Sequence, residues 1–361
     1  MINVFDVTDF GAVGDGVTDC TESIQKALDA AGEVKGEVVI PPGKYLCGEV
    51  KVPESITVSG THGWGYRDVG GSVLVLNNGD NTCLFNMTGA HGTKLSGLQF
   101  VGEEKGKNVH GIYVKWELYN GNGATFWDGY TTDFHEDSIV IDDCQVRFFS
   151  GNGIHLDHIF AFTIRNCHVI RNGGNGIYID GWDGWISNTI VSFNDLYGIR
   201  GENVCSSITI TGNRTEWNRM GGYCFDCGGS IIINSNSFDR NMGPAIYLPD
   251  TKKGKEHWRS KYVINGNVFW RNGKPRKTPF ENELLSSHIL IEKSANCIIT
   301  SNTFEIGIDD GGGGIKSPDY GIALISSNGI IVKDNVMGNA AVKQRMYYES
   351  CDDCIEKDNI V

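Results

Sequence analysis

The sequence repeats one short segment five times, as Gly153-Ile154-His155-Leu156-Asp157, Gly176-Ile177-Tyr178-Ile179-Asp180, Gly198-Ile199-Arg200-Gly201-Glu202, Gly222-Tyr223-Cys224-Phe225-Asp226 and Ala245-Ile246-Tyr247-Leu248-Pro249. A polar landmark recurs with these segments at Asp143, Asn166, Asn188, Asn213, Asn236, Asn267, Asn302 and Asn335. The first five landmarks lie 23, 22, 25 and 23 residues apart. A period of about 22–25 residues with short alternating apolar strands predicts a parallel β-helix. Leucine-rich repeats have a similar period but a Leu-dominated consensus, which this sequence lacks.

The coils of such a solenoid stack at the strand spacing of about 4.8 Å, so equivalent residues form ladders. The apolar positions are predicted to point inward, and the landmark Asn is predicted to bond to the Asn of the next coil. The inward ladders are Ile154, Ile177, Ile199 and Ile246, with Leu156, Ile179, Phe225 and Leu248 beside them. Cys144 and Cys167, one residue after a landmark, are expected to be small buried side chains.

The first residues differ from the repeat. Thr18-Asp19 is a candidate N-cap, and apolar residues at helical spacing predict one amphipathic helix over 20–31 that caps the solenoid. We therefore expect a single domain over 1–361, with a strand and capping helix in 1–45 and coils in 46–361. Inserts interrupt the period at 115–137, 249–261, 273–287 and 306–319, and such inserts usually build the walls of a binding groove.

Composition restricts the function. The chain has 361 residues with 48 Gly, 8 Pro and a formal charge of −13, which exclude a collagen, a disordered chain and a nucleic-acid backbone binder. No apolar stretch approaches the length of a membrane span, so no membrane partner is expected. The start MINVFDVTDFG has no basic region followed by an apolar one, and the odd count of 11 Cys favours a reducing compartment. We expect a cytoplasmic protein, or a secreted one if a signal has been removed.

The outward positions of the repeat carry the candidate site. Alternation predicts an outward stripe of the carboxylates Asp157, Asp180, Glu202 and Asp226, to which Asp183 could add another. Stacked carboxylates repel, which raises some of their pKa values unless a cation intervenes. Adjacent coils would give the ~5–5.5 Å carboxyl separation of a retaining glycosidase, and alternate coils the ~6.5–9.5 Å of an inverting one. Side chains beside this stripe that could bind substrate are His155, Tyr178, Arg200 and Tyr247.

Other residues support a saccharide site. Glu216 and Asp239 follow successive landmarks and could form a second acid pair, and Trp182, Trp185 and Trp217 could stack on sugar rings. The insert 249–261 is basic and could receive a polyuronate or sulfated glycan, or be a solvated flap. Cys224-x-x-Cys227 and Cys351-x-x-Cys354 resemble zinc half-sites, but they lie far apart along the chain, so no metal site is predicted.

The stretch Phe5-Asp6-Val7-Thr8-Asp9-Phe10-Gly11-Ala12-Val13-Gly14-Asp15-Gly16-Val17-Thr18-Asp19, with Val39-Ile40-Pro41-Pro42-Gly43-Lys44-Tyr45, closely resembles the opening of the pectate-lyase-like superfamily. That resemblance implies a right-handed parallel β-helix, shared there by lyases, glycosidases, epimerases and phage tailspikes. Gly60-Thr61-His62-Gly63-Trp64-Gly65, the coil Tyr197–Trp217, Phe280-Glu281-Asn282-Glu283 and His288-Ile289-Leu290-Ile291-Glu292 are similar to inulin fructotransferases and difructose-anhydride hydrolases. This narrower resemblance implies a homotrimer that acts on a saccharide with paired acids. The positions that align with that pair fall near Ile159 and Ile170, so it does not place the acids.

These observations predict an all-β right-handed parallel β-helix that cleaves or transfers glycosyl units of an oligo- or polysaccharide with paired carboxylates. One acid would protonate the leaving oxygen, and a carboxylate one coil away would act as nucleophile or base. One alternative is a polyuronate lyase or epimerase, with Ca²⁺ between the stacked acids. Another is a non-catalytic tailspike or glycan-binding fibre. No other cofactor is expected, and a homo-oligomer, with a trimer favoured, is expected from the resemblance.

Overall fold

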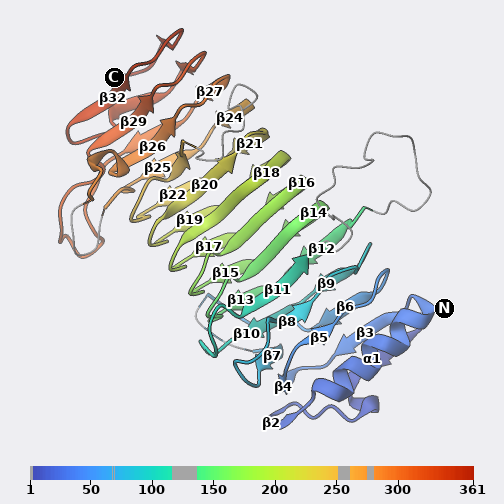
Figure 1. The fold of residues 1–361 in the computed structure, drawn as a ribbon. Coiled ribbons are helices and arrows are strands. Elements are labelled where there is room, and N and C mark those ends of the chain that lie inside the picture. Colours follow the sequence, from blue (N-terminus) through green and yellow to red (C-terminus); the bar gives the residue numbers. More distant parts are fainter. Residues whose placement is uncertain (1–2, 67, 69, 116–135, 251–260, 275–279) are drawn as a thin grey trace, which may run out of the picture. The chain divides into compact units, whose positions relative to one another are not determined.

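The structure is a computed structural model, and it describes residues 3–66, 68, 70–115, 136–250, 261–274 and 280–361. Nearly all regular structure in these residues is β-strand paired in parallel, with a single α-helix, which confirms the predicted fold class (Figure 1). The chain divides into two compact units, residues 1–173 with 179–184 and residues 174–178 with 185–361. One continuous domain over 1–361 therefore stays a prediction. Among the described residues, no helix combines the length and apolar character that crossing a bilayer requires.

The first unit contains a main sheet and a narrow sheet, and between successive strands of the narrow sheet the chain forms one or two strands of the main sheet. The main sheet holds β1 (Val4–Asp6), β3 (Glu37–Ile40), β5 (Val50–Lys51), β6 (Thr57–Gly60), β8 (Cys83–Asn86), β9 (Lys94–Ser96), β11 (His110–Lys115), β12 (Ile139–Asp142) and β14 (Ile154–Arg165). The narrow sheet holds β2 (Asp15–Asp19), β4 (Gly43–Cys47), β7 (Ser72–Leu76), β10 (Leu98–Val101), β13 (Gln145–Arg147) and β15 (His168–Ile170). Strand β16 (Ile177–Ser187) contributes its residues 179–184 to this unit.

The second unit repeats the same two-sheet plan. Its main-sheet strands are β18 (Tyr197–Thr211), β20 (Gly221–Cys227), β21 (Ser230–Asn234), β23 (Ile246–Leu248), β24 (Lys261–Asn265), β26 (Ser287–Glu292), β27 (Cys297–Thr300), β29 (Tyr320–Ile325), β30 (Ile331–Lys333), β32 (Gln344–Glu349) and β33 (Ile355–Lys357). Its narrow-sheet strands are β17 (Ile190–Ser192), β19 (Arg214–Glu216), β22 (Ser237–Asp239), β25 (Val268–Trp270), β28 (Thr303–Glu305) and β31 (Val336–Asn339). A short 3-10 helix, η3 (Glu283–Leu285), precedes β26.

The predicted core positions are buried. Ile154, Leu156, Ile177, Ile179, Ile199 and Ile246 are 0% exposed, and Phe225 and Leu248 at most 2%. Cys144 and Cys167 are also buried, as predicted.

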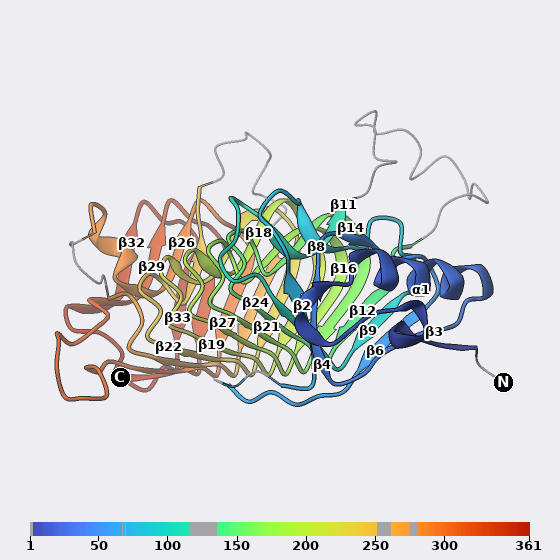
Figure 2. The same ribbon diagram turned by 90° about the horizontal axis from the view of Figure 1, so that it is seen from below.

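The capping helix is longer than predicted. Helix α1 (Thr21–Val34) buries Ile24, Ala27, Leu28 and Ala31 and packs against β1, β3, β5 and the 3-10 helix η1 (Val7–Phe10) (Figure 1, Figure 2). Cys20, rather than Thr18-Asp19, occupies the N-cap position, and the Asp19 carboxylate accepts a hydrogen bond from the Thr21 N–H at 2.9 Å. The helix ends at Val34, and its C-cap residue Lys35 has a φ of 53°, in the left-handed region.

In the second unit, the predicted Asn ladder is continuous. The side-chain N–H of each residue donates to the side-chain oxygen of the next at 3.0 Å, in the order Asn213, Asn236, Asn267, Asn302, Asn335 and Asn359. The same oxygens also accept the backbone N–H of the preceding ladder residue, so each of these buried N–H groups is paired. A second ladder that the sequence analysis missed runs through Asn194, Asn218, Asn241 and Asn272.

The first three landmarks do not belong to this ladder, which corrects the prediction. Asp143, Asn166 and Asn188 have φ of 51°, 55° and 50°, and the ladder position falls one residue later, at Cys144, Cys167 and Thr189. The landmark residues there turn the chain in the left-handed conformation that Asn and Asp tolerate. This one-residue change of phase accounts for the long spacing between Asn188 and Asn213.

We predict that Asn267→Ala lowers the free energy of unfolding by about 2–4 kcal/mol. The change leaves buried hydrogen-bonding groups of Asn236, Ile233 and Asn302 without their partner. Urea denaturation followed by circular dichroism measures the loss. Asn265→Ala, an exposed position two residues earlier, is the control and should change stability by less than about 0.5 kcal/mol. An equal loss in both variants would contradict a structural role for the ladder.

Candidate active site

A bulge in β14 builds the centre of the candidate site. Alternation holds from Ile154 to Asp157, but His158 has a φ of 56°, in the left-handed region. Asp157 and His158 are therefore both half-buried outside the core, and Ile159 is the next core residue. A left-handed residue inside a strand resets the two-residue period. Here it places two adjacent polar side chains on one surface.

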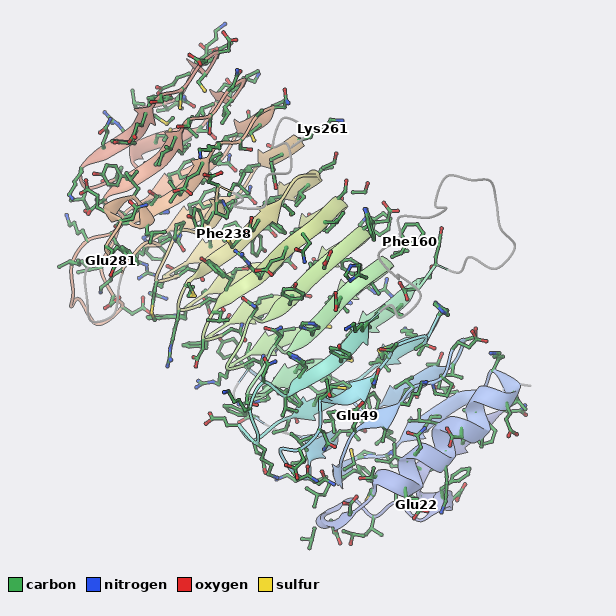
Figure 3. The ribbon with its side chains drawn as sticks, viewed as in Figure 1. Glu22, Glu49, Phe160, Phe238, Lys261 and Glu281 are labelled. Atoms are coloured by element: carbon green, nitrogen blue, oxygen red, sulfur yellow. The ribbon has the colours of Figure 1, made fainter. Side chains whose placement is uncertain are left out.

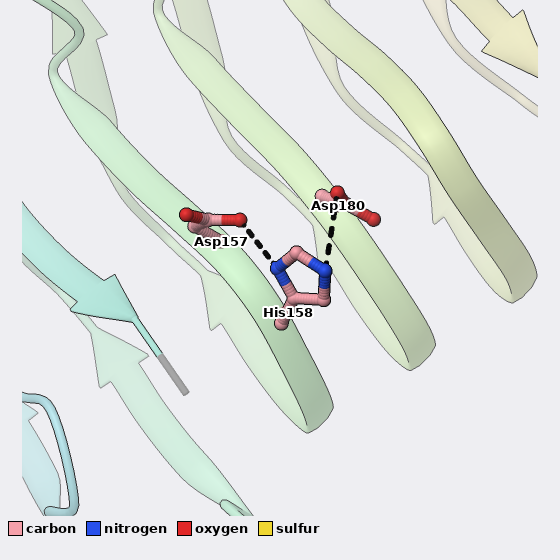
Figure 4. Close-up of side chains that lie close together, drawn as sticks. All are labelled: Asp157, His158 and Asp180. Atoms are coloured by element: carbon pink, nitrogen blue, oxygen red, sulfur yellow. Dashed lines mark hydrogen bonds and ion pairs between the residues drawn. The ribbon is translucent and has the colours of Figure 1, made fainter. Parts of the chain in front are cut away.

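His158 lies between two carboxylates (Figure 4). Its Nδ1 is 2.6 Å from Asp157 Oδ1, and its Nε2 is 4.0 Å from Asp180 Oδ2. The ligating atoms of the three side chains all lie within 4.8 Å of one another. Asp180 is 0% exposed, whereas the side chains of Asp157 and His158 are 23% and 31% exposed.

Close backbone packing sets this geometry. A Cβ atom on Gly181 would overlap the carbonyl oxygen of Ile159, so β16 lies directly against β14 at this point. A side chain at position 181 would hold the two backbones apart and move Asp180 away from His158.

Three aromatic rings stack beside the carboxylates in the first unit. The His155 ring is 4.4 Å from His110 and 5.2 Å from Tyr113, measured between centroids. Asn152 contacts both histidines. Its backbone N–H donates to His110 Nδ1 at 2.9 Å, and its side-chain Nδ2 lies 2.8 Å from His155 Nδ1. Burial lowers the pKa of His155 to about 4 and that of His110 to about 3, so both rings are neutral at pH 7. Lys115, which pairs with Asp157 in the strand register, is exposed.

In the second unit, a cation separates the stacked acids. Glu202 and Asp226 are register partners, as predicted, and both approach Arg200, at 2.8 and 3.3 Å. Tyr178 donates to Glu202 Oε2 at 3.4 Å, and Tyr247 donates to Glu292 Oε2 at 3.0 Å. Arg200 is thus held by two carboxylates, and the predicted repulsion is offset there by its positive charge.

The predicted tryptophan cluster is dispersed. Trp182 is half-buried and Trp185 is 53% exposed, both on β16, where Asp183 is also half-buried with a φ of 54°. Trp217 follows β19 of the narrow sheet, where its ring stacks on Phe193 at 5.8 Å and lies under Arg240. Trp217 therefore does not share the main-sheet surface with Tyr178 and Tyr247, which corrects the prediction.

Glu216 and Asp239 stack as predicted, but in the narrow sheet of the second unit and in contact with arginines. Arg214 lies 3.0 Å from Glu216, while Arg240 and Arg271 lie 2.9 and 2.8 Å from Asp239. Asp310, from the insert 306–319, also contacts Arg240 and Arg271. The pair is therefore part of an ion-pair network that fastens this insert.

Most of the basic insert lies outside the described residues, including Lys252, Lys253, Lys255, His257 and Arg259. Its last residue, Lys261, begins β24 and is exposed (Figure 3).

Comparisons with known proteins agree with this architecture. The family model of the right handed beta helix region matches residues 152–337, which is more than half of the chain. The chain belongs to the right-handed β-helix family. A second model, rhamnogalacturonase A/epimerase, pectate lyase-like, matches residues 4–63, so the resemblance found in the opening of the sequence is confirmed.

The relatives of this β-helix chain act on carbohydrates. It is 29% identical over 214 residues to depolymerase 1, capsule K30/K69-specific, of Klebsiella phage K5-2, which covers 53% of this chain and 26% of that protein. It is 27% identical over 204 residues to mannuronan C5-epimerase AlgE4 of Azotobacter vinelandii, which covers 54% and 35%. The chain thus spans about a quarter to a third of the length of these curated relatives.

Solved β-helix structures resemble the fold over nearly the whole chain. The A-module of A. vinelandii mannuronan C-5 epimerase AlgE6 superposes with a TM-score of 0.65 at 17% identity, covering 98% of this chain and 99% of that one. DFA-IIIase from Arthrobacter chlorophenolicus A6, in complex with GF2, gives 0.62 at 16% identity, covering 93% and 88%. At these identities the likeness concerns the fold.

Sequence reasoning missed His158, His110, Tyr113 and Lys115. His158 had a signal: two polar residues, instead of one, separate the apolar Leu156 and Ile159. An extra residue between core positions of a strand indicates a bulge, and bulges are frequent beside active sites.

We predict that Asp239→Asn lowers the free energy of unfolding by about 3 kcal/mol. The side chains of Arg240 and Arg271 are 9% and 6% exposed, and both would lose a carboxylate partner. Asp195→Asn is the control, because its ion pair with Arg219 is exposed on both sides and should contribute less than about 1 kcal/mol. Urea denaturation of both variants makes the comparison, and equal losses would contradict the network.

The buried histidines predict a loss of stability in mild acid. Since the pKa of His155 falls from 6.5 to about 4 on folding, the unfolded chain binds a proton that the folded chain does not bind in this range. Stability should therefore decrease as the pH falls from 6.5 to 4, by about 1.4 kcal/mol per pH unit for each such proton. His155→Gln should flatten this dependence in urea titrations at several pH values. His62→Gln, whose ring is half exposed, should retain it.

Proposed function

We propose that this protein modifies a uronate-containing polysaccharide by moving the proton on the sugar carbon that bears the carboxylate, as an epimerase or a lyase. One observation carries the proposal: His158 is held by Asp157 through Nδ1 and presents Nε2 toward the buried Asp180. A carboxylate accepts hydrogen bonds and does not donate them, so the proton of a neutral His158 resides on Nδ1. The electron pair of the imidazole is then on Nε2, where it can accept a proton from substrate.

The surroundings of His158 suit an anionic sugar. A proton next to a carboxylate becomes easier to remove when a positive charge offsets the charge of that carboxylate. Lys115, exposed and in register with Asp157, can supply such a charge. The neutral stack of His110, Tyr113 and His155 offers a flat face on which a sugar ring can pack.

The relatives support this class of substrate. Several mannuronan C5-epimerases of A. vinelandii match 54–65% of the chain at 24–27% identity. Removal of the C5 proton followed by addition of a solvent-derived proton to the other face gives epimerisation. Removal followed by loss of the glycosidic oxygen at C4 gives a lyase product.

A second candidate is hydrolysis or transfer of a glycosyl unit by paired carboxylates. The Asp157 and Asp180 oxygens lie within 4.8 Å of each other, close to the ~5–5.5 Å of retaining glycosidases. The capsule depolymerase and the DFA-IIIase among the similar proteins are the reason to test this reaction as well.

We propose no cofactor for either reaction, because Ca²⁺ takes six to eight oxygen ligands and this group offers two carboxylates and an imidazole. The homotrimer implied by the sequence resemblance is a further proposal, measurable by sedimentation.

Incubation with polysaccharides in deuterium oxide separates these reactions. An epimerase should leave deuterium at C5 of polymannuronate or polygalacturonate, detected by NMR. A lyase should instead produce unsaturated uronate ends on these polymers, and in either case inulin should be unchanged. New reducing ends with neither unsaturated uronate ends nor deuterium at C5 would instead establish the hydrolase.

We predict that His158→Gln lowers turnover at least ~10²-fold, the low end of general acid–base contributions. Asp157→Asn and Asp180→Asn should also lower turnover, because each removes a carboxylate that faces the imidazole. His62→Gln is the matched control: its Nδ1 lies 2.8 Å from Asp143, but its Nε2 lies 3.2 Å from the carbonyl oxygen of Trp64 instead of facing a carboxylate. Full activity in His158→Gln, with folding verified by circular dichroism, would refute the proposed role.

A further inference from the structure

We infer that His158 Nε2 and Asp180 also form a binding site for a divalent transition-metal ion of the zinc class, with Asp157 orienting the imidazole, and that metal bound there blocks proton transfer. The first observation is the orientation of His158. Histidines that ligate metals through one ring nitrogen almost always donate the other N–H to a carboxylate or carbonyl, which fixes the ring and its tautomer. His158 has this arrangement, with Asp157 Oδ1 at 2.6 Å from Nδ1.

The second observation is the separation between Nε2 and Asp180. The distance of 4.0 Å exceeds that of a hydrogen bond. Two bonds of about 2.1 Å, typical of zinc to nitrogen or carboxylate oxygen, can span it when the angle at the metal is wide. Asp157, bonded to Nδ1, lies at the other ring nitrogen and acts on such a site by orienting the imidazole.

The donor set selects the metal. Imidazole with carboxylates suits zinc, iron, cobalt and nickel, whereas calcium and magnesium prefer oxygen alone. The site is also reachable, since Asp157 and His158 retain 23% and 31% of their side-chain exposure. Asp180, which is 1% exposed, supplies a ligand whose position is fixed by packing.

The first unit contains a natural comparison. His62 makes the same contact through Nδ1, to Asp143 at 2.8 Å, but its Nε2 faces the carbonyl oxygen of Trp64 at 3.2 Å. A neutral carbonyl at hydrogen-bond distance leaves no space for an ion between the two atoms. The two histidines therefore share the orienting carboxylate and differ in the second ligand.

Metal binding and proton transfer would compete for one electron pair. The Nε2 pair that ligates the metal is the pair that accepts the substrate proton, so the metal acts as a reversible inhibitor. This inhibitory clause rests on the proposed function, whereas metal binding itself does not.

Direct titration tests the site without substrate. Metal-free protein carrying Cys351→Ser and Cys354→Ser, which removes the half-exposed thiols, is titrated with Co²⁺ and followed by its visible absorption. Zn²⁺ is then added as a competitor. We expect one saturable site per chain, lost in His158→Gln, weakened about 10–100-fold in Asp157→Asn and unchanged in His62→Gln.

Each other outcome overturns a defined part of the inference. Absence of a saturable site, or equal binding in His158→Gln, overturns the metal site. If Zn²⁺ binds but does not lower the rate of deuterium exchange by an active enzyme, the inference that the metal inhibits is overturned. The same inference is overturned if the enzyme loses activity when a chelator removes the metal. Metal binding in a protein that is inactive on every polysaccharide leaves the metal site established and refutes the proposed function.

Discussion

Parallel stacking of one coil on the next is the constraint from which the rest of this structure follows. Where a strand pairs in register with its equivalent one coil away, its side chains stand directly over their counterparts. Apolar residues and Asn benefit from this repetition, since apolar groups pack and amides bond in series. Charged residues do not, and each stacked carboxylate requires a compensating group. Arg200 serves Glu202 and Asp226, while Arg240 and Arg271 serve Asp239.

The candidate active site lies where the alternation of inward and outward side chains along β14 is interrupted. His158 adopts the left-handed conformation, so β14 presents two consecutive polar side chains instead of one. This local exception brings an imidazole between the carboxylates of two coils, an arrangement that strict alternation cannot produce. The cost of a left-handed residue that is not glycine is modest, of the order of 1–2 kcal/mol, and the packed coils on both strands hold it in place.

The sequence predicts what repeats and misses what does not. Five related segments were enough to predict the fold class and the inward residues, and the helical spacing of apolar residues in 20–31 predicted the capping helix, because these depend on period alone. The role of His158 could not be derived, since alternation assumes that no residue resets the period. The one-residue change of phase between the landmarks Asn188 and Asn213 was missed for the same reason. The network around Asp239 was missed because Asp310 reaches it from an insert about 70 residues further along the chain.

The same geometry bears on which reaction the fold performs here. Inward residues specify the β-helix, so relatives with epimerase and depolymerase names can share it while their outward residues differ. In this chain, Asp157 is already bonded to His158 at 2.6 Å. If Asp157 were the nucleophile of a glycosidase and attacked through Oδ1, it would have to give up a charge-assisted hydrogen bond worth about 1.5–3 kcal/mol. If it attacked through its other oxygen, the imidazole would still withdraw negative charge from the carboxylate. Proton transfer through His158 uses that bond intact, because the bond keeps the proton on Nδ1 and the electron pair on Nε2. The hydrogen bond between Asp157 and His158 therefore disfavours the glycosidase mechanism and favours proton transfer.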